Sequence, residues 1–157
     1  MKLNADFTDL LTHFSDHQVE FALIGGWALA VYGYARGTDD LDVLVRATPE
    51  NAERVMRALA AFGAPIAQHH VTASLFATPD YGYRMGVKPN LIEILTTISG
   101  VTFDDVMKEH RTVDVEGRKV AVIGRGALLT NKRASGRAKD LADVEWLEAH
   151  PAEEPDR

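Results

Sequence analysis

The sequence predicts an α/β or α+β domain, and three observations lead to this fold class. Segments with apolar residues at helical spacing alternate with short apolar runs of strand length, and a hairpin turn separates two of the runs. The length of 157 residues matches one domain. No apolar run approaches the roughly 20 residues of a membrane-spanning helix, so we expect no membrane segment.

The chain starts with a helix and with a strand that ends at two glycines. Apolar residues at helical spacing predict the helix over residues 5–16, namely Phe7, Leu10, Leu11 and Phe14. The apolar run 21–24 ends at Gly25-Gly26 and predicts a buried strand. Residues 27–34 follow as a compact apolar helix.

A second buried strand and a longer helix come next. The apolar residues 41–45, introduced by the polar loop 36–39, predict the strand. Thr48 suits an N-cap, Pro49 suits the first helical position and Gly63 suits the end of a helix. We therefore expect a helix that begins after Thr48 and stops at Gly63.

Three more strands and a short helix are expected in the middle of the chain. The strands cover residues 73–77, 83–87 and 91–95, of which the last has the clearest apolar pattern. The helix covers residues 102–110 and starts with a capping threonine.

A hairpin and two helices complete the predicted elements. The turn at residues 116–117 joins strands at 111–115 and 118–123. The helices cover residues 125–134 and 137–149.

The second of these helices places Leu141, Val144 and Leu147 on one apolar face. Residues 151–157, with the sequence PAEEPDR, are polar and interrupted by proline, so we expect a disordered tail. The predicted domain is residues 1–150.

The composition excludes several classes of site. The chain has no cysteine, which excludes disulfides, thiolate zinc sites, iron–sulfur clusters and cysteine nucleophiles. Its six histidines do not cluster, and no H-E-x-x-H pattern indicates zinc. Neither a P-loop nor a Rossmann glycine pattern occurs. The N-terminus carries acids where a signal peptide has bases, so we expect a cytoplasmic protein.

The charge is unevenly distributed. The net charge of −6 disfavours a protein that coats a polyanion. Between Lys108 and Lys139, however, nine Lys or Arg residues stand against three acids. This basic stretch is either a surface that faces phosphates or a solvated face.

Two acids on one strand carry the strongest chemical signal. Side chains alternate along a strand, so Asp40 and Asp42 point to the same face, with Cα atoms about 6.6–7 Å apart. Carboxylates this close raise each other's pKa unless a cation lies between them. A hard divalent ion such as Mg²⁺, or Mn²⁺ in its place, takes oxygen ligands and would stabilise the pair. The alternative is an edge strand with a solvated face.

A third acid and two glycines extend this signal. Glu93 stands alone in the apolar strand 91–95 and joins the two aspartates if the strands are neighbours. Three carboxylates can hold two metal ions roughly 3.5–4 Å apart, the arrangement used for phosphoryl transfer. Gly25 and Gly26 open a helix and would let a triphosphate approach backbone N–H groups. The alternatives are an exposed strand position for Glu93 and a simple strand-to-helix turn for the glycines.

Four further residues are candidates for nucleotide binding. Arg36 and Thr38 precede the aspartates in a polar loop and could contact phosphate. Lys132 and Lys139 could receive the triphosphate or an anionic group of an acceptor. The lysines could equally pair with nearby acids or complement helix ends, because Lys139 and Asp143 are four residues apart.

The order Gly25-Gly26 and then Asp40-Leu41-Asp42 resembles the signature of the DNA-polymerase-β-like nucleotidyltransferase superfamily. The resemblance extends over about residues 21–150.

Within this superfamily, the chain is most similar to small bacterial members grouped with abortive-infection and toxin–antitoxin nucleotidyltransferases. Those proteins tend to share an Arg-x-Thr-x-Asp-h-Asp loop, here residues 36–42, and a strand that runs into Ser-Gly, here residues 91–100. They also tend to share an Arg-x-Lys-Asp-h-x-Asp helix, here residues 137–143.

The resemblance implies a nucleotidyltransferase fold, with a mixed β-sheet flanked by helices and with helices at the C-terminus. It implies that Asp40 and Asp42 ligate two Mg²⁺ or Mn²⁺ ions and that Gly25 and Gly26 contact the β- and γ-phosphates of an NTP. Glu93 would be the third carboxylate, which binds one metal and helps to deprotonate the acceptor, where the family more often has aspartate.

Two functions follow from these expectations. The first is a metal-dependent transfer of a nucleoside monophosphate from an NTP to an acceptor hydroxyl on an RNA end, a small molecule or a protein, with release of pyrophosphate. The alternative is a catalytically idle binding module, for instance a component of a toxin–antitoxin pair. The acceptor, the base of the NTP and the oligomeric state, including a homo-oligomer, stay open.

Overall fold

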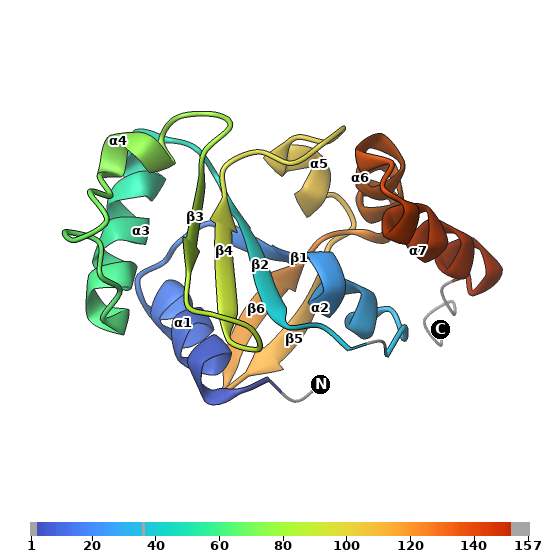
Figure 1. The fold of residues 1–157 in the computed structure, drawn as a ribbon, viewed down its shortest axis with the longest axis horizontal. Helices are drawn as coiled ribbons and strands as arrows, with labels where there is room; N and C mark the ends of the chain where they lie inside the picture. Colours follow the sequence, from blue (N-terminus) through green and yellow to red (C-terminus); the bar gives the residue numbers. More distant parts are fainter. Residues whose placement is uncertain (1–2, 36, 152–157) are drawn as a thin grey trace.

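The computed structural model describes residues 3–35 and 37–151. In these ranges six strands form one mixed sheet with the order β3-β4-β2-β1-β6-β5 (Figure 1). The strands β1 and β6 are parallel, as are β2 and β4, and the other neighbours are antiparallel. The strands are β1 (Phe21–Ile24), β2 (Asp40–Val45), β3 (Gly82–Met85), β4 (Leu91–Leu95), β5 (Arg111–Val115) and β6 (Arg118–Val122).

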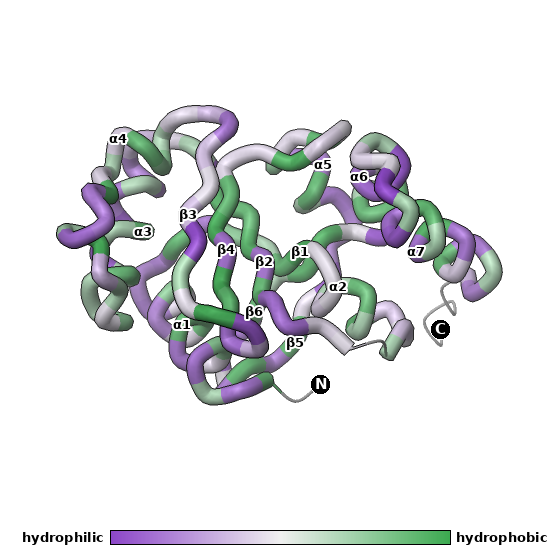
Figure 2. The backbone as a smooth tube through the Cα atoms, in the orientation of Figure 1, coloured by the Kyte–Doolittle hydropathy of each residue, from purple (hydrophilic) through white to green (hydrophobic). Residues whose placement is uncertain are grey.

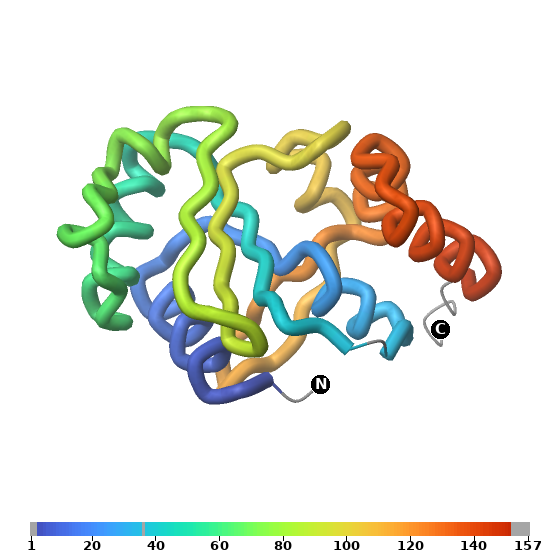
Figure 3. Tube along the Cα trace, viewed as in Figure 1, coloured from blue at the N-terminus to red at the C-terminus, as the bar shows by residue number. Residues whose placement is uncertain are grey.

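Helices accompany the sheet along the whole described chain. They are α1 (Ala5–Asp16), α2 (Gly25–Val31), α3 (Pro49–Phe62), α4 (Ala73–Phe76), α5 (Phe103–Met107), α6 (Arg125–Ser135) and α7 (Ala138–Ala149). Helix α1 packs against α3 and against the hairpin β5–β6, so segments that are far apart in the sequence lie side by side (Figure 3). Helices α6 and α7 pack on each other beside the sheet. The mixed α+β fold expected from the sequence is confirmed.

The core lies between the helices and the central strands. All four residues of β1 are buried, and so are Leu41, Val43 and Val45 on β2. Figure 2 shows the apolar character concentrated along β1, β2 and β4, with hydrophilic residues where β2 begins. The central strands are therefore held by burial of apolar side chains, which is the main driving force for folding.

Local signals in the sequence set several boundaries as expected. Thr48 caps α3, because its side chain accepts a hydrogen bond from the backbone N–H of Asn51. Gly63 ends this helix with φ of 93°, a conformation that favours glycine. Thr102 caps α5 in a reciprocal arrangement with Asp105.

One predicted strand is wrong, because residues 73–77 form the short helix α4 instead. The backbone N–H of Ala77 donates to the carbonyl of Ala73, which closes a helical turn. The segment contains alanine, serine, leucine and phenylalanine but no β-branched residue, and Phe76 alone in α4 is buried. Its apolar pattern was therefore too short to separate one turn of helix from a strand.

Smaller differences concern element ends and one exposed side chain. Helix α2 begins at Gly25 and ends at Val31, whereas residues 27–34 were expected. Strand β3 ends at Met85, because Gly86 has φ of 80° and turns the chain toward β4. Leu141 is 50% exposed, so it does not share the buried face of α7.

The described residues leave part of one prediction untested. Of the expected tail, residues 152–157 lie outside the described ranges. No helix in the part of the chain that the structure describes has the length and apolar character that crossing a membrane requires.

The topology brings together one end of each of the four strands β1, β2, β4 and β6. These strand ends form a single edge of the sheet, which differs from the outer strands β3 and β5. Because β2 is antiparallel to β1 and parallel to β4, the end of β1 lies beside the beginnings of β2 and β4. Strand β6 is parallel to β1 and ends at the same edge, where it leads into α6. Residues from distant parts of the sequence therefore meet at this edge.

Asn51 fixes the start of α3 to the strands, and its loss is expected to destabilise the fold. Its buried amide accepts from the backbone N–H of Glu20 at 2.7 Å and donates to the carbonyls of Glu20 and Arg46 at 3.0 and 2.9 Å. Asn51→Ala removes three buried hydrogen bonds and leaves the Glu20 N–H without this acceptor, while the two carbonyls keep bonds from the backbone N–H groups of Arg46 and Thr48. The free energy of unfolding should therefore fall by about 3 kcal/mol. Urea denaturation measures this change, and Glu53→Ala on the exposed side of α3 serves as control.

Candidate active site

The turn between β1 and α2 forms one wall of the candidate site. Gly25 has φ of 67°, and a Cβ atom at this position would lie 2.4 Å from Oδ2 of Asp42. Ile24, the last residue of β1, stands opposite Asp42 in the sheet. A side chain at Gly25 would displace the Asp42 carboxylate, so glycine is required here by close approach as well as by φ.

The predicted carboxylates lie on neighbouring strands. Asp40 and Asp42 are two residues apart on β2 and share one face of the sheet. Glu93 on β4 stands directly beside Asp42 in the parallel register. The structure therefore brings the three predicted acids to the same edge of the sheet.

The environment of Asp42 disfavours its charge. Burial, followed by the nearby charges of Glu93 and Asp40, raises the pKa of Asp42 from 3.8 to about 6. The positive charges of Lys139 and Lys132 act in the opposite direction. Oδ1 of Asp40 is buried and has no hydrogen-bond partner. Asp40 thus has a carboxylate oxygen without a protein partner, and Asp42 has surroundings that disfavour its negative charge.

The carboxylate of Glu93 lies against β3. Its Oε2 lies 3.4 Å from Nη2 of Arg84, and a Cβ atom on Gly82 would be 3.9 Å from its Oε1. Within residues 3–35 and 37–151, no three carboxylate or imidazole groups are close enough to enclose a metal ion. A centre with three carboxylate ligands would therefore require Glu93 to turn toward Asp42.

The aspartates fit the requirements of a hard divalent cation. Carboxylate oxygens are the ligands that Mg²⁺ prefers. The unpartnered Oδ1 of Asp40 and the raised pKa of Asp42 both indicate negative charge that a cation would stabilise. The donor set of Asp40 and Asp42, with Glu93 within reach, thus suits Mg²⁺ or Mn²⁺.

Thr38 packs against the second glycine of the turn. A Cβ atom on Gly26 would lie 2.8 Å from Oγ1 of Thr38, and this hydroxyl donates to the carbonyl of Asp40 at 3.1 Å. Thr38 therefore holds the beginning of β2 beside the glycine turn. Arg36, the other candidate in this loop, lies outside the described residues.

The two predicted lysines have different surroundings. Lys132 is buried, with Nζ at 2.9 Å from Oδ2 of Asp143 and 3.5 Å from Oδ1 of Asp140. Ser135 and Arg137 also donate to Asp140, at 2.6 and 2.7 Å. Lys132 thus joins α6 to α7 as well as lining the site. Lys139 is exposed beside the aspartates.

An aromatic stack attaches α7 to the segment after α2. The ring of Trp146 lies between Tyr34 and His150, with centroid distances of 4.5 and 4.2 Å and interplanar angles of 10° and 14°. This contact lies two residues before Arg36 and holds the helix that carries Lys139 next to the loop with Thr38.

These residues surround a cleft with two connected parts. A cavity of about 200 Å³ is lined by the glycine turn and by the loop that contains Thr38. A larger cavity of about 690 Å³ continues past Glu93 to β3 and to residues 97–99. The aspartates and Lys139 border both parts. The cleft can therefore hold an extended ligand with the carboxylates near its middle.

Two basic residues of the cleft were not singled out from the sequence. Arg84 and Lys88 both line the larger cavity. Arg84 lies directly opposite Glu93 because β3 pairs with β4. The expected strand 83–87 contained Arg84, and pairing of this strand with the strand of Glu93 would have identified it.

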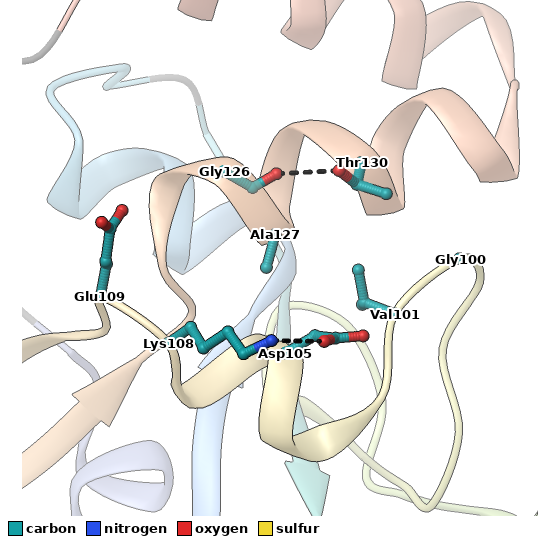
Figure 4. A pocket seen from close by; sticks show the side chains of 8 residues that line it. All are labelled: Gly100, Val101, Asp105, Lys108, Glu109, Gly126, Ala127 and Thr130. Carbon is teal, nitrogen blue, oxygen red and sulfur yellow. Dashed lines mark hydrogen bonds and ion pairs between the residues drawn. The ribbon is translucent and has the colours of Figure 1, made fainter.

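Another cavity, of about 550 Å³, lies between α5 and α6 (Figure 4). Its charged residues include Lys108 and Asp105, which pair with each other at 3.4 Å. Its hydroxyl group, on Thr130, donates to the carbonyl of Gly126. The polar groups that line this cavity are thus mostly occupied with one another, in contrast to those of the cleft.

Solved structures with the same fold are nucleotidyltransferases. An inferred nucleotidyltransferase of Thermotoga maritima has a TM-score of 0.58 at 16% identity, over 94% of this chain and 96% of its own. The antibiotic-resistance factor ANT(2″)-Ia has a TM-score of 0.57 at 12% identity, over 89% and 79%. The lincosamide antibiotic adenylyltransferase LnuA, solved with lincomycin, has a TM-score of 0.55 at 15% identity, over 95% and 98%.

No protein-family model and no curated protein sequence matches the chain. At these identities the structural likeness establishes the fold alone. The chain therefore has the nucleotidyltransferase fold, as the resemblance in its sequence implied.

The raised pKa of Asp42 predicts a pH-dependent stability in the absence of divalent metal. A carboxyl whose pKa is higher in the folded than in the unfolded state stabilises the fold at low pH, and this contribution is lost between about pH 4 and 6. At pH 7 in EDTA, Asp42→Asn should therefore raise the free energy of unfolding by at most about 3 kcal/mol, and the gain should vanish near pH 4.

Urea denaturation across this pH range measures the difference. Asp9→Asn, an exposed acid on α1, controls for the loss of one negative charge. A gain that is independent of pH would contradict the expected role of Asp42.

Proposed function

From the nucleotidyltransferase fold, we propose that the chain transfers a nucleoside monophosphate from an NTP to an acceptor hydroxyl and releases pyrophosphate. The observation that carries this proposal is the row of acids at one edge of the sheet. Asp40, Asp42 and Glu93 lie on adjacent strands, and the glycine turn approaches Asp42 so closely that a side chain would not fit. This arrangement suits phosphoryl transfer, in which positioning and charge neutralisation provide most of the catalysis.

The smaller part of the cleft supports binding of the triphosphate. Backbone N–H groups at a glycine turn that opens a helix favour anions, and Gly25 and Gly26 line this part. Lys139 and Arg137 border the same space and supply positive charge.

The carboxylates would hold the metal ions that this chemistry uses. Asp40 and Asp42 would bind Mg²⁺ or Mn²⁺, and Glu93 would complete the set after it turns from Arg84. When bound, two such ions neutralise charge on the attacking and leaving oxygens.

The transfer itself is a single displacement at the α-phosphorus. The acceptor oxygen forms a bond to phosphorus while the bond to the pyrophosphate oxygen breaks, and pyrophosphate leaves with the electron pair. In this proposal Glu93 would take the proton of the acceptor hydroxyl, because its strand lies beside that of Asp42 on the side away from the glycine turn.

One observation favours the idle binding module as a second candidate. Glu93 contacts Arg84 and is not gathered with the aspartates in the described residues. A chain that binds NTP but transfers nothing would retain the cleft and lack a working third carboxylate. Membership of a toxin–antitoxin pair would belong to this candidate, and pyrophosphate release with added acceptors separates it from the enzyme.

Removal of the paired aspartates tests the site directly. We expect the wild type to bind one NTP only with Mg²⁺ or Mn²⁺, and Asp40→Asn/Asp42→Asn to lose this binding because its metal ligands are gone. Loss of metal assistance is worth several kcal/mol, so any transfer activity should fall on the order of a thousandfold. Calorimetric titration with each of the four NTPs measures binding and identifies the donor.

The matched control is Asp6→Asn/Asp9→Asn, which removes two exposed acids from α1. NTP binding that survives in the cleft variant, or that needs no metal, would refute the proposed role of the aspartates.

A further inference from the structure

The proposed site continues in a straight row across the sheet to its edge strand. In the register of the strands, Ile24 on β1 stands beside Asp42 on β2, Asp42 beside Glu93 on β4, and Glu93 beside Arg84 on β3. Neighbouring strands are about 4.8 Å apart, and the row runs across them at right angles to the strands. It leads from the glycine turn, over the carboxylates, to Arg84.

The direction of this row locates the acceptor, given the proposed function. In phosphoryl transfer the attacking and the leaving oxygens lie roughly in line on opposite sides of phosphorus. If the pyrophosphate leaves over Gly25, the acceptor approaches from the side of Glu93. The next side chain in the row is Arg84, which lines only the larger of the two parts of the cleft.

Arg84 is available to a ligand. Its side chain is 66% exposed, and its contact with Glu93 is long, at 3.4 Å. Exposed ion pairs of this kind contribute little to stability, so the guanidinium can exchange Glu93 for another anion. The planar guanidinium can donate two parallel hydrogen bonds to a phosphate or carboxylate.

The surroundings of Arg84 do not favour a cationic acceptor. Lys88 lines the same part of the cleft, and Thr97, Ser99 and Asn131, which also line it, are uncharged. The acids that line this part have other partners or roles: Asp40, Asp42 and Glu93 serve the proposed transfer, and Asp140 is bound by Lys132, Ser135 and Arg137. A polycation would therefore meet like charge here, which disfavours its binding.

We propose that Arg84 selects acceptors that carry an oxyanion, phosphate or carboxylate, near the hydroxyl that receives the nucleotide. This inference rests on the proposed function and adds the chemical class of the acceptor and the residue that recognises it.

Comparison of the affinities of defined probes tests the proposal. The full chain is saturated with Mg²⁺ and an unreactive α,β-methylene analogue of the NTP that the aspartate experiment identifies. Calorimetry then measures the binding of each probe in turn. The anionic probes are glycerol 3-phosphate, glycerate and the dinucleotide uridylyl-uridine, the uncharged probe is glycerol, and the polycation is tobramycin. Comparison of glycerol 3-phosphate, glycerate and the dinucleotide distinguishes a phosphomonoester, a carboxylate and a phosphodiester as the source of the oxyanion.

We expect at least one anionic probe to bind ten times more tightly than glycerol or tobramycin. Arg84→Ala should weaken that binding tenfold or more. Arg84→Lys should lose less affinity, because lysine keeps the positive charge but not the two parallel hydrogen bonds of the guanidinium. Arg57→Ala, an exposed arginine on α3 away from the cleft, is the matched control and should bind the probe as the wild type does.

Three results with the acceptor probes would overturn the proposal. They are tighter binding of tobramycin than of every anion, no binding of any anion, and equal affinity of the Arg84→Ala variant. A loss of NTP-analogue affinity in Arg84→Ala would also overturn it, because Arg84 would then serve the donor. If the wild type binds no NTP at all, the proposed function fails first, and the two failures are thus distinguished.

Discussion

The rest of the site depends on the crowding of negative charge at the beginning of β2. This strand buries Leu41 and Val43 in the core, so its other face must carry Asp40 and Asp42. The turn after β1 then has to be glycine, because any side chain would enter the space of the Asp42 carboxylate. Folding thus brings together acids that repel one another, and a cation bound between them would relieve this repulsion.

Positive charges on α6 and α7 partly offset the negative charge of the aspartates, and the cleft stays open. Lys132 is buried between Asp140 and Asp143, so much of its charge is balanced within the helix pair. Such a buried group is costly to separate from its partners, which makes the helix pair a rigid unit. Lys139, on the exposed side of the same unit, is left facing the aspartates. The pair therefore has a structural part at Lys132 and an exposed part that borders the cleft at Lys139.

Much of the fold and of the acid cluster could be predicted from the sequence, because local signals determine them. Thr48 and Gly63 set the ends of α3, and alternation on a strand placed Asp40 and Asp42 on one face. The pairing of strands depends on contacts between distant segments. For this reason the contact of Arg84 with Glu93 was not visible in the pattern of residues. Pairing of Lys132 with nearby acids was one of two interpretations of the sequence, and its burial between Asp140 and Asp143 appears only in the structure.

Strand β3 is the outer strand of the sheet next to β4, so its residues can be exchanged with less disturbance than those of a central strand. Changes in a central strand disturb two neighbours, whereas β3 pairs with β4 alone in the described sheet. Its outward side chains can therefore be exchanged while the strands that carry the aspartates remain packed. One scaffold could in this way keep its chemistry and acquire new targets through a few substitutions along a single border of the sheet.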